Sequence, residues 1–197
     1  MTGAVLAGGQ SRRMGSNKAF IKVDGVPIIE RVLAVLMEVF DERLIIADEV
    51  GLFKGFSSGA RAIPDFYKGA GSLGGIYTAL LNSSSETAFV TACDMPDINA
   101  EAVTRVISTP LESAGAILPF IEGRPHPMHA LYHRDCLGPM EEMIKSGNLR
   151  ITDFLNKIAV KRLTEKDFTG LNIEASVANI NTREELHSRG AGEEFTK

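Results

Sequence analysis

Tryptophan is absent from the chain, and cysteine, aromatic residues and long apolar runs are scarce. The two cysteines, Cys93 and Cys136, are too few for a disulfide framework, and neither stands in the spacing of a metal-binding motif. No apolar run approaches the roughly 18 residues of a membrane-spanning helix, so we expect no membrane association. The first residues, MTGAVLAGG, lack the basic start and long apolar stretch of a secretory signal, so we expect a reduced, cytoplasmic setting.

The chain also lacks an excess of positive charge. It has 21 Lys and Arg against 25 Asp and Glu, which gives a formal net charge of −4. Nucleic-acid binding depends on neutralising phosphates with a basic surface, so we expect no nucleic-acid partner. The length of 197 residues fits one domain, which we expect over residues 1–190, with residues 191–197 as a flexible polar tail.

Apolar runs of strand length alternate with helix-like segments along the chain. We expect strands over residues 4–7, 43–47, 61–64, 87–92, 114–120 and 128–132, and helices over 27–39, 76–81, 99–107, 134–146 and 150–158 and from about residue 183. This alternation is typical of an α/β fold with a mainly parallel sheet between two layers of helices. Ligands of such sheets bind at the carboxyl ends of the strands. Three polar segments, 8–18, 65–75 and 93–96, follow predicted strands, and we expect them to converge in one crevice.

Glycine, in contrast to the aromatic residues, is plentiful and clustered. The first cluster lies in the segment LAGGQSRRMGSNK at residues 6–18, directly after the first predicted strand. Its glycines allow backbone N–H groups to approach an anion, and Arg12, Arg13 and Lys18 add positive charge. The spacing differs from both GxxxxGK[ST] and GxGxxG. A solvated surface loop is the alternative, but the position after a buried strand favours phosphate binding.

Two carboxylates follow other predicted strands. Asp94 comes two residues after the predicted strand 87–92, and its carboxylate suits Mg²⁺, which binds one or two carboxylates together with substrate phosphates. The alternative is a turn residue ahead of Pro96. We expect the neighbouring Cys93 to be a buried apolar residue rather than a nucleophile. Asp65, ahead of the glycines at 69–75, can accept from a base N–H or a ribose hydroxyl, or can simply belong to a turn.

The segment RPHPMH at residues 124–129 is stiffened by two prolines. Its histidines, His126 and His129, can contact an acidic substrate. A metal site formed by them and His133 would need a helix, which the prolines oppose. Further along, Asn179 and Asn181 can cap a helix or face a ligand from an extended segment.

Taken together, these motifs resemble the molybdenum cofactor guanylyltransferases, whose opening signature is LAGGxSxRMGxxK. The resemblance extends over nearly the whole chain, through Asp65 and its glycines, CDMP at 93–96, RPHPMHALY at 124–132 and NINTREEL at 179–186. Two residues depart from the family pattern, because Ser72 and Arg183 stand where the family often has proline. Both of these positions look structural.

The resemblance implies a Rossmann-like three-layer nucleotidyltransferase fold and a defined reaction. GMP is transferred from GTP to the phosphate of molybdopterin, giving the guanine dinucleotide cofactor and pyrophosphate, with Mg²⁺. The implied partners are GTP, molybdopterin and, transiently, the proteins that deliver molybdopterin and accept the product. The expected GTP-binding residues are Leu6, Ala7, Gly8, Gly9, Lys18, Asp65 and Asp94. The expected catalytic residues are Lys18, Asp94, Arg12 and Arg13, with Asp94 as the metal ligand.

Two alternatives remain open at this point. The chain can be a related nucleotidyltransferase that uses CTP or a different phosphate acceptor. It can also be a nucleotide-binding protein that kept the fold without the activity, although the presence of both Lys18 and Asp94 counts against that.

Overall fold

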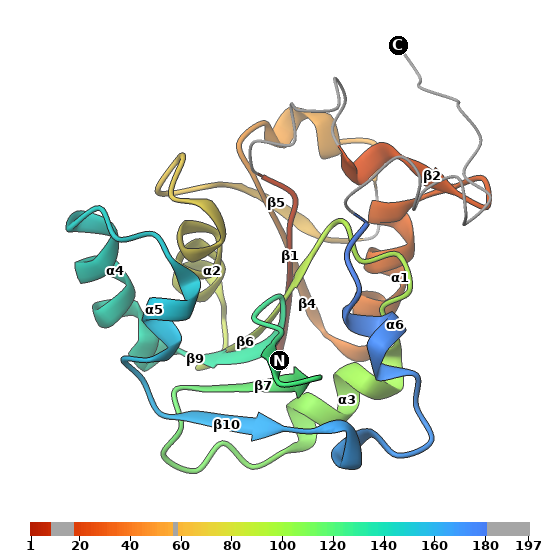
Figure 1. The fold of residues 1–197 in the computed structure, drawn as a ribbon. Helices are drawn as coiled ribbons and strands as arrows, with labels where there is room; N and C mark the ends of the chain where they lie inside the picture. The colour runs from red at the N-terminus through yellow and green to blue at the C-terminus, as the bar shows by residue number, and fades with distance from the viewer. Residues whose placement is uncertain (9–17, 57–58, 181–197) are drawn as a thin grey trace.

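The computed structural model describes residues 1–8, 18–56 and 59–180 (Figure 1). Its strands are β1 (Thr2–Leu6), β2 (Lys22–Val23), β3 (Val26–Pro27), β4 (Glu42–Ala47), β5 (Arg61–Pro64), β6 (Thr87–Ala92), β7 (Ala116–Ile121), β8 (Arg124–Pro125), β9 (His129–His133) and β10 (Val160–Leu163). Its α-helices are α1 (Ile28–Val39), α2 (Gly71–Asn82), α3 (Ala100–Ser108), α4 (Leu137–Lys145), α5 (Ile151–Leu155) and α6 (Ile173–Val177). Short 3₁₀ helices are η2 (Lys18–Phe20), η3 (Val50–Phe53), η4 (Arg134–Cys136) and η5 (Glu165–Phe168).

Eight of the described strands form one sheet, in the order β10-β7-β9-β6-β1-β4-β5, with β8 paired to β7. β1 runs parallel to both β4 and β6, and β4–β5 and β7–β10 are also parallel pairs. β9 runs antiparallel to β6 and β7, and β8 is antiparallel to β7. The predicted α/β fold with a mainly parallel sheet is therefore confirmed.

Alternating side chains of the central strands build a separate core on each face of the sheet. Val5 and Ile45 face one core, which α1, α3 and α6 cover, whereas Leu6 and Ile46 face the other, which α2, α4 and α5 cover. Figure 1 shows these two groups of helices on opposite sides of the sheet. Strands buried on both faces read as continuous apolar runs, and this explains why they stand out in the sequence.

Local sequence signals set the ends of several helices. α1 begins directly after Pro27, and its buried residues include Ile29, Val32 and Leu36, at the spacing of one helical face. The side chain of Asn99 caps α3 by accepting a hydrogen bond from the N–H of Ala102. No helix within the described residues is both long and apolar enough to cross a membrane.

Two predicted helices have ends that differ clearly from the structure. α2 begins at Gly71, inside the second glycine cluster, rather than at residue 76. The helix predicted over 150–158 ends at Leu155, and the chain then forms β10. The helix predicted from about residue 183, like the tail at 191–197, lies outside the described residues.

The amino end of the sheet is held by a network around Glu42. Its Oε2 accepts hydrogen bonds from Thr2 Oγ1 (2.6 Å), Ser84 N (2.8 Å) and Ser84 Oγ (2.7 Å), and its Oε1 lies 3.0 Å from Arg61. Burial alone would raise the pKa of Glu42, but these hydrogen bonds outweigh it and lower the pKa to about 2. The ionised carboxylate therefore stabilises the fold at neutral pH.

We expect Glu42→Gln to lower the free energy of unfolding by about 2 kcal/mol at pH 7, because charge-assisted hydrogen bonds are lost. A depressed pKa gives stability that is present above the unfolded pKa near 4.5 and lost as the pH falls toward 2. Urea unfolding at pH 7 and pH 2.5 should thus show the difference between wild type and variant shrinking at the lower pH. Glu38→Gln, at an exposed position of α1, is the control; an equal effect there would contradict the assignment.

Candidate functional site

Three segments that are distant in sequence meet in one pocket at the carboxyl ends of β1, β4, β5 and β6. The pocket has a volume of about 230 Å³. Its lining residues are Leu6, Gly8, Ile46, Asp65, Gly71, Ser72, Gly75, Ala92, Cys93, Asp94, Met128 and Asn179. The predicted convergence after β1, β5 and β6 is confirmed for the described residues of these segments, with residues 9–17 outside them.

Lys18 and Asp94 form an ion pair near the carboxyl ends of β1 and β6. Lys18 Nζ lies 3.6 Å from Asp94 Oδ2, and the two side chains are only 17% and 19% exposed. The ammonium also donates a hydrogen bond to the carbonyl of Ile180 at 2.9 Å. The N–H of Ile180 in turn donates to the carbonyl of Asp94 at 2.9 Å. A main-chain segment that follows α6 thereby closes around the charged pair.

Asp94 has the features of a cation ligand. Its Oδ1 is buried and accepts no hydrogen bond from the described residues. Burial raises the pKa of this carboxyl, and the nearby Lys18 ammonium partly opposes the shift. A hard oxygen with no donor in reach suits a divalent cation that takes its other ligands from water and phosphate.

Asp65 is held at the opposite side of the pocket, after β5. Its Oδ1 accepts from the N–H of Tyr67 (3.2 Å) and from Thr78 Oγ1 (2.8 Å), which fixes the side chain. The pKa of Asp65 is raised, mainly because the carboxyl is partly buried. The hydrogen bonds from Thr78 and Tyr67 oppose this shift, and the negative charge of Asp48 adds to it. An oriented carboxylate of this kind is an acceptor for ligand N–H or hydroxyl groups.

The second glycine cluster brings α2 close to β1. A Cβ on Gly75 would lie 2.8 Å from Leu6 Cδ1, so a larger residue would push Leu6 within the pocket. Gly71, with a φ of +61°, starts the helix, and the first turn of α2 at Gly71 and Ser72 lines the pocket. The N–H groups at a helix N-terminus favour anions. Ser72, whose position we expected to be structural, also lines this pocket.

The other predicted site residues fall into three groups. Leu6, Gly8, Asp65 and Asp94 line the pocket, and Lys18 reaches it through Asp94. Ala7 is not among the lining residues, because its side chain faces the core beneath α1. Gly9, Arg12 and Arg13 lie outside the described residues, as do Asn181 and Arg183.

Two residues near the pocket are buried and neutral. Cys93 is 8% exposed, as predicted, and burial raises the pKa of its thiol to about 12. His129 is completely buried, so the prediction that it contacts an acidic substrate is wrong. His126 is partly exposed, and burial lowers the pKa of its ring.

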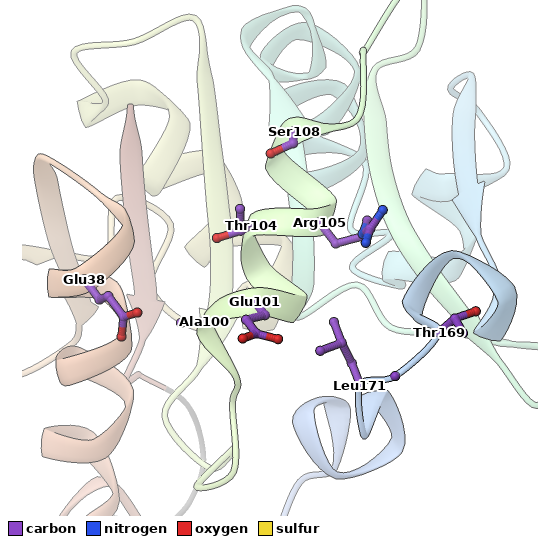
Figure 2. A pocket seen from close by; sticks show the side chains of 9 residues that line it. Glu38, Ala100, Glu101, Thr104, Arg105, Ser108, Thr169 and Leu171 are labelled. Carbon is purple, nitrogen blue, oxygen red and sulfur yellow. The ribbon is translucent and has the colours of Figure 1, made fainter.

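A second depression, of about 630 Å³, is lined by residues of α1 and α3 and by residues 169–171. Figure 2 shows Glu38 on one side of α3 and Thr169 and Leu171 on the other. It is larger than the pocket at the strand ends but shares no lining residue with it. The smaller pocket is the candidate site, because it contains the residues at the carboxyl ends of the parallel strands.

A mainly parallel sheet with a helix N-terminus and a lysine–carboxylate pair at its carboxyl edge is an arrangement typical of α/β proteins that bind phosphorylated ligands. The family model described as "MobA-like NTP transferase domain" matches residues 3–161, and the chain belongs to this family.

Relatives and solved structures agree with that assignment. The chain is 36% identical to a "Probable molybdenum cofactor guanylyltransferase" of Pelotomaculum thermopropionicum, over 94% of this chain and 89% of the relative. The solved structure of molybdopterin-guanine dinucleotide biosynthesis protein A from Archaeoglobus fulgidus superposes with a TM-score of 0.83, at 28% identity and 96% coverage of both chains. A 2-C-methyl-D-erythritol 4-phosphate cytidylyltransferase from Thermus thermophilus shares the fold at a TM-score of 0.69 and 16% identity, over 95% of this chain and 96% of that one. The protein is thus a nucleotidyltransferase.

Proposed function

We propose that the protein transfers GMP from GTP to the phosphate of molybdopterin and releases pyrophosphate. Relatives that align over nearly the whole chain carry the name molybdenum cofactor guanylyltransferase. The structural observation that carries the proposal is the pairing of Lys18 with Asp94, a carboxylate that lines the same pocket as the first turn of α2. An ammonium group is thereby paired with a carboxylate of a pocket that the start of a helix also lines.

In the proposed reaction, a phosphate oxygen of molybdopterin attacks the α-phosphorus of GTP. An O–P bond forms, and the bond to the β-phosphate oxygen breaks as pyrophosphate leaves. The attacking group is already an anion, so no protein base is required. The chain then contributes positioning and charge neutralisation, through Lys18 and, in the segment outside the described residues, Arg12 and Arg13.

Asp94 would hold Mg²⁺, for which its unpaired Oδ1 is the fitting ligand. When bound, such a cation neutralises negative charge on phosphate oxygens. Leu6, at the end of β1, and Gly8 would contact the nucleotide from the pocket lining. Ala7, whose side chain faces the core, would contribute through its main chain, and Gly9 of the same segment lies outside the described residues. Asp65, fixed by Tyr67 and Thr78, would accept from the guanine or the ribose.

The test offers the purified protein Mg²⁺, molybdopterin and either GTP or CTP, and measures pyrophosphate. We expect release with GTP and not with CTP. Release with CTP alone would instead assign the protein to the cytidylyltransferases. Nucleotide binding without release in either case would contradict catalysis and support a binding protein.

Other expectations from the sequence belong to the same proposal. We propose a single nucleotidyltransferase domain over residues 1–190, a cytoplasmic location and transient contacts with the proteins that deliver molybdopterin and receive the product. We also propose that nucleic acid is not a partner, since the net charge of −4 does not favour binding to its phosphates.

A further inference from the structure

A buried histidine, His129, is not among the residues that the proposed reaction places in contact with the substrate. His129 on β9 is fully buried and pairs in register with Thr91 on β6. Its ring packs edge-to-face on Phe89, with the centroids 5.2 Å apart. Burial lowers the pKa of His129 to about 4, so the ring is neutral at pH 7.

The ring is joined to α6 through one hydroxyl group. His129 Nε2 lies 3.1 Å from Ser176 Oγ, and this oxygen also accepts a hydrogen bond from the N–H of Asn99 at 3.0 Å. Ser176, like His129, is fully buried. One hydroxyl therefore connects β9, the start of α3 and α6. Its removal would take this partner from the buried His129 ring and from the N–H of Asn99.

The helix held in this way leads directly into the site. Four residues after Ser176, Ile180 offers its carbonyl to Lys18 Nζ and its N–H to the carbonyl of Asp94. Between them, Asn179 lines the pocket. Val177 and Ile180 are 5% and 3% exposed and pack in the same core, so this short connection has little freedom to move independently of α6. The position of α6 consequently fixes both hydrogen bonds of Ile180.

We propose that His129 and Ser176 are positioning residues for the transfer reaction: they anchor α6 so that Ile180 holds Lys18 and Asp94 in their reactive arrangement. The inference rests on the proposed function. Neither side chain touches the substrate, and both act through the Ile180 main chain.

The test compares two serine-to-alanine variants that each remove a buried hydroxyl. Ser176→Ala removes the anchor, whereas Ser83→Ala removes a hydroxyl that is 5% exposed and bonded to Thr2 Oγ1 (2.8 Å) at the other end of the sheet. In Ser176→Ala we expect kcat to fall about tenfold with KM for GTP nearly unchanged, since misplacement of reacting groups slows the chemical step. We also expect hydrogen exchange at the Ile180 amide to become about tenfold faster, and neither change in Ser83→Ala.

A second pair of variants separates anchoring from general stability. His129→Gln retains a group that can hydrogen-bond to Ser176 and should remain close to wild type, whereas His129→Leu should reproduce the loss of kcat and of Ile180 protection. Unchanged exchange at Ile180 in both Ser176→Ala and His129→Leu would overturn the inference. So would equal losses of kcat in Ser176→Ala and Ser83→Ala. If wild type shows no guanylyl transfer, the proposed function fails, and exchange at Ile180 still decides whether the anchor exists.

Discussion

Asp94→Asn is expected to reduce turnover about 1000-fold while leaving the fold intact, because it removes the charge of the one carboxylate whose buried oxygen has no hydrogen-bond donor among the described residues. Asparagine keeps the size of the side chain, and the main-chain bond from the N–H of Ile180 to the carbonyl of residue 94 persists. Pyrophosphate release under saturating GTP and Mg²⁺ measures kcat, and circular dichroism checks the fold.

Asp97→Asn is the matched control for this experiment. Asp97 lies three residues further along the chain, and its Oδ1 lies 3.7 Å from Arg31 Nη2. We expect this variant to stay within about threefold of the wild-type rate, as substitutions outside a reacting centre usually do. A near-normal rate in Asp94→Asn with Mg²⁺ present would remove Asp94 from its role as a cation ligand.

Lys18→Met is expected to lower kcat about 100-fold and to raise KM for GTP about tenfold. The variant loses a largely buried ammonium group that is proposed to neutralise charge on the phosphates of GTP. The loss also leaves Asp94 without its paired cation and the Ile180 carbonyl without its donor. Initial rates over a range of GTP concentrations separate the two constants.

Lys54→Met, at an exposed position after η3, controls for the change in net charge and should leave both constants unchanged. Kinetic constants of Lys18→Met that equal those of wild type would exclude the lysine from the site. A loss confined to KM would restrict Lys18 to binding the nucleotide.

Most of the fold could be predicted from the sequence, because the strands at the centre of the sheet are buried on both faces. Residues 87–92 are an example, since β6 is apolar throughout its middle. β10 could not be predicted in this way, because Lys161 and Arg162 interrupt its apolar pattern and only Leu163 is buried. The β2–β3 hairpin did carry a signal, in the form of Asp24-Gly25 between valines, with both turn residues at positive φ.

The candidate site was predictable to the extent that it depends on side chains at strand ends. Asp65 and Asp94 follow strands closely, so the rule for parallel sheets brings them to the same edge. The contribution of Ile180 could not be foreseen, since it acts through its carbonyl and N–H groups, which every residue other than proline possesses. The hydrogen bond from Thr78 to Asp65 could not be predicted either, because it joins residues 13 positions apart and depends on how α2 packs after β5.

The hydrogen bond from Lys18 to Ile180 joins residues 162 positions apart. During synthesis, β1, β4 and β6 can pair long before residue 180 has been added, but Lys18 gains its second partner only afterwards. A chain that stops at residue 161, where the family match ends, would retain the strands from β1 to β9 yet lack the segment that closes around Lys18 and Asp94. An incomplete chain would therefore resemble the finished protein in its sheet while lacking this part of its site.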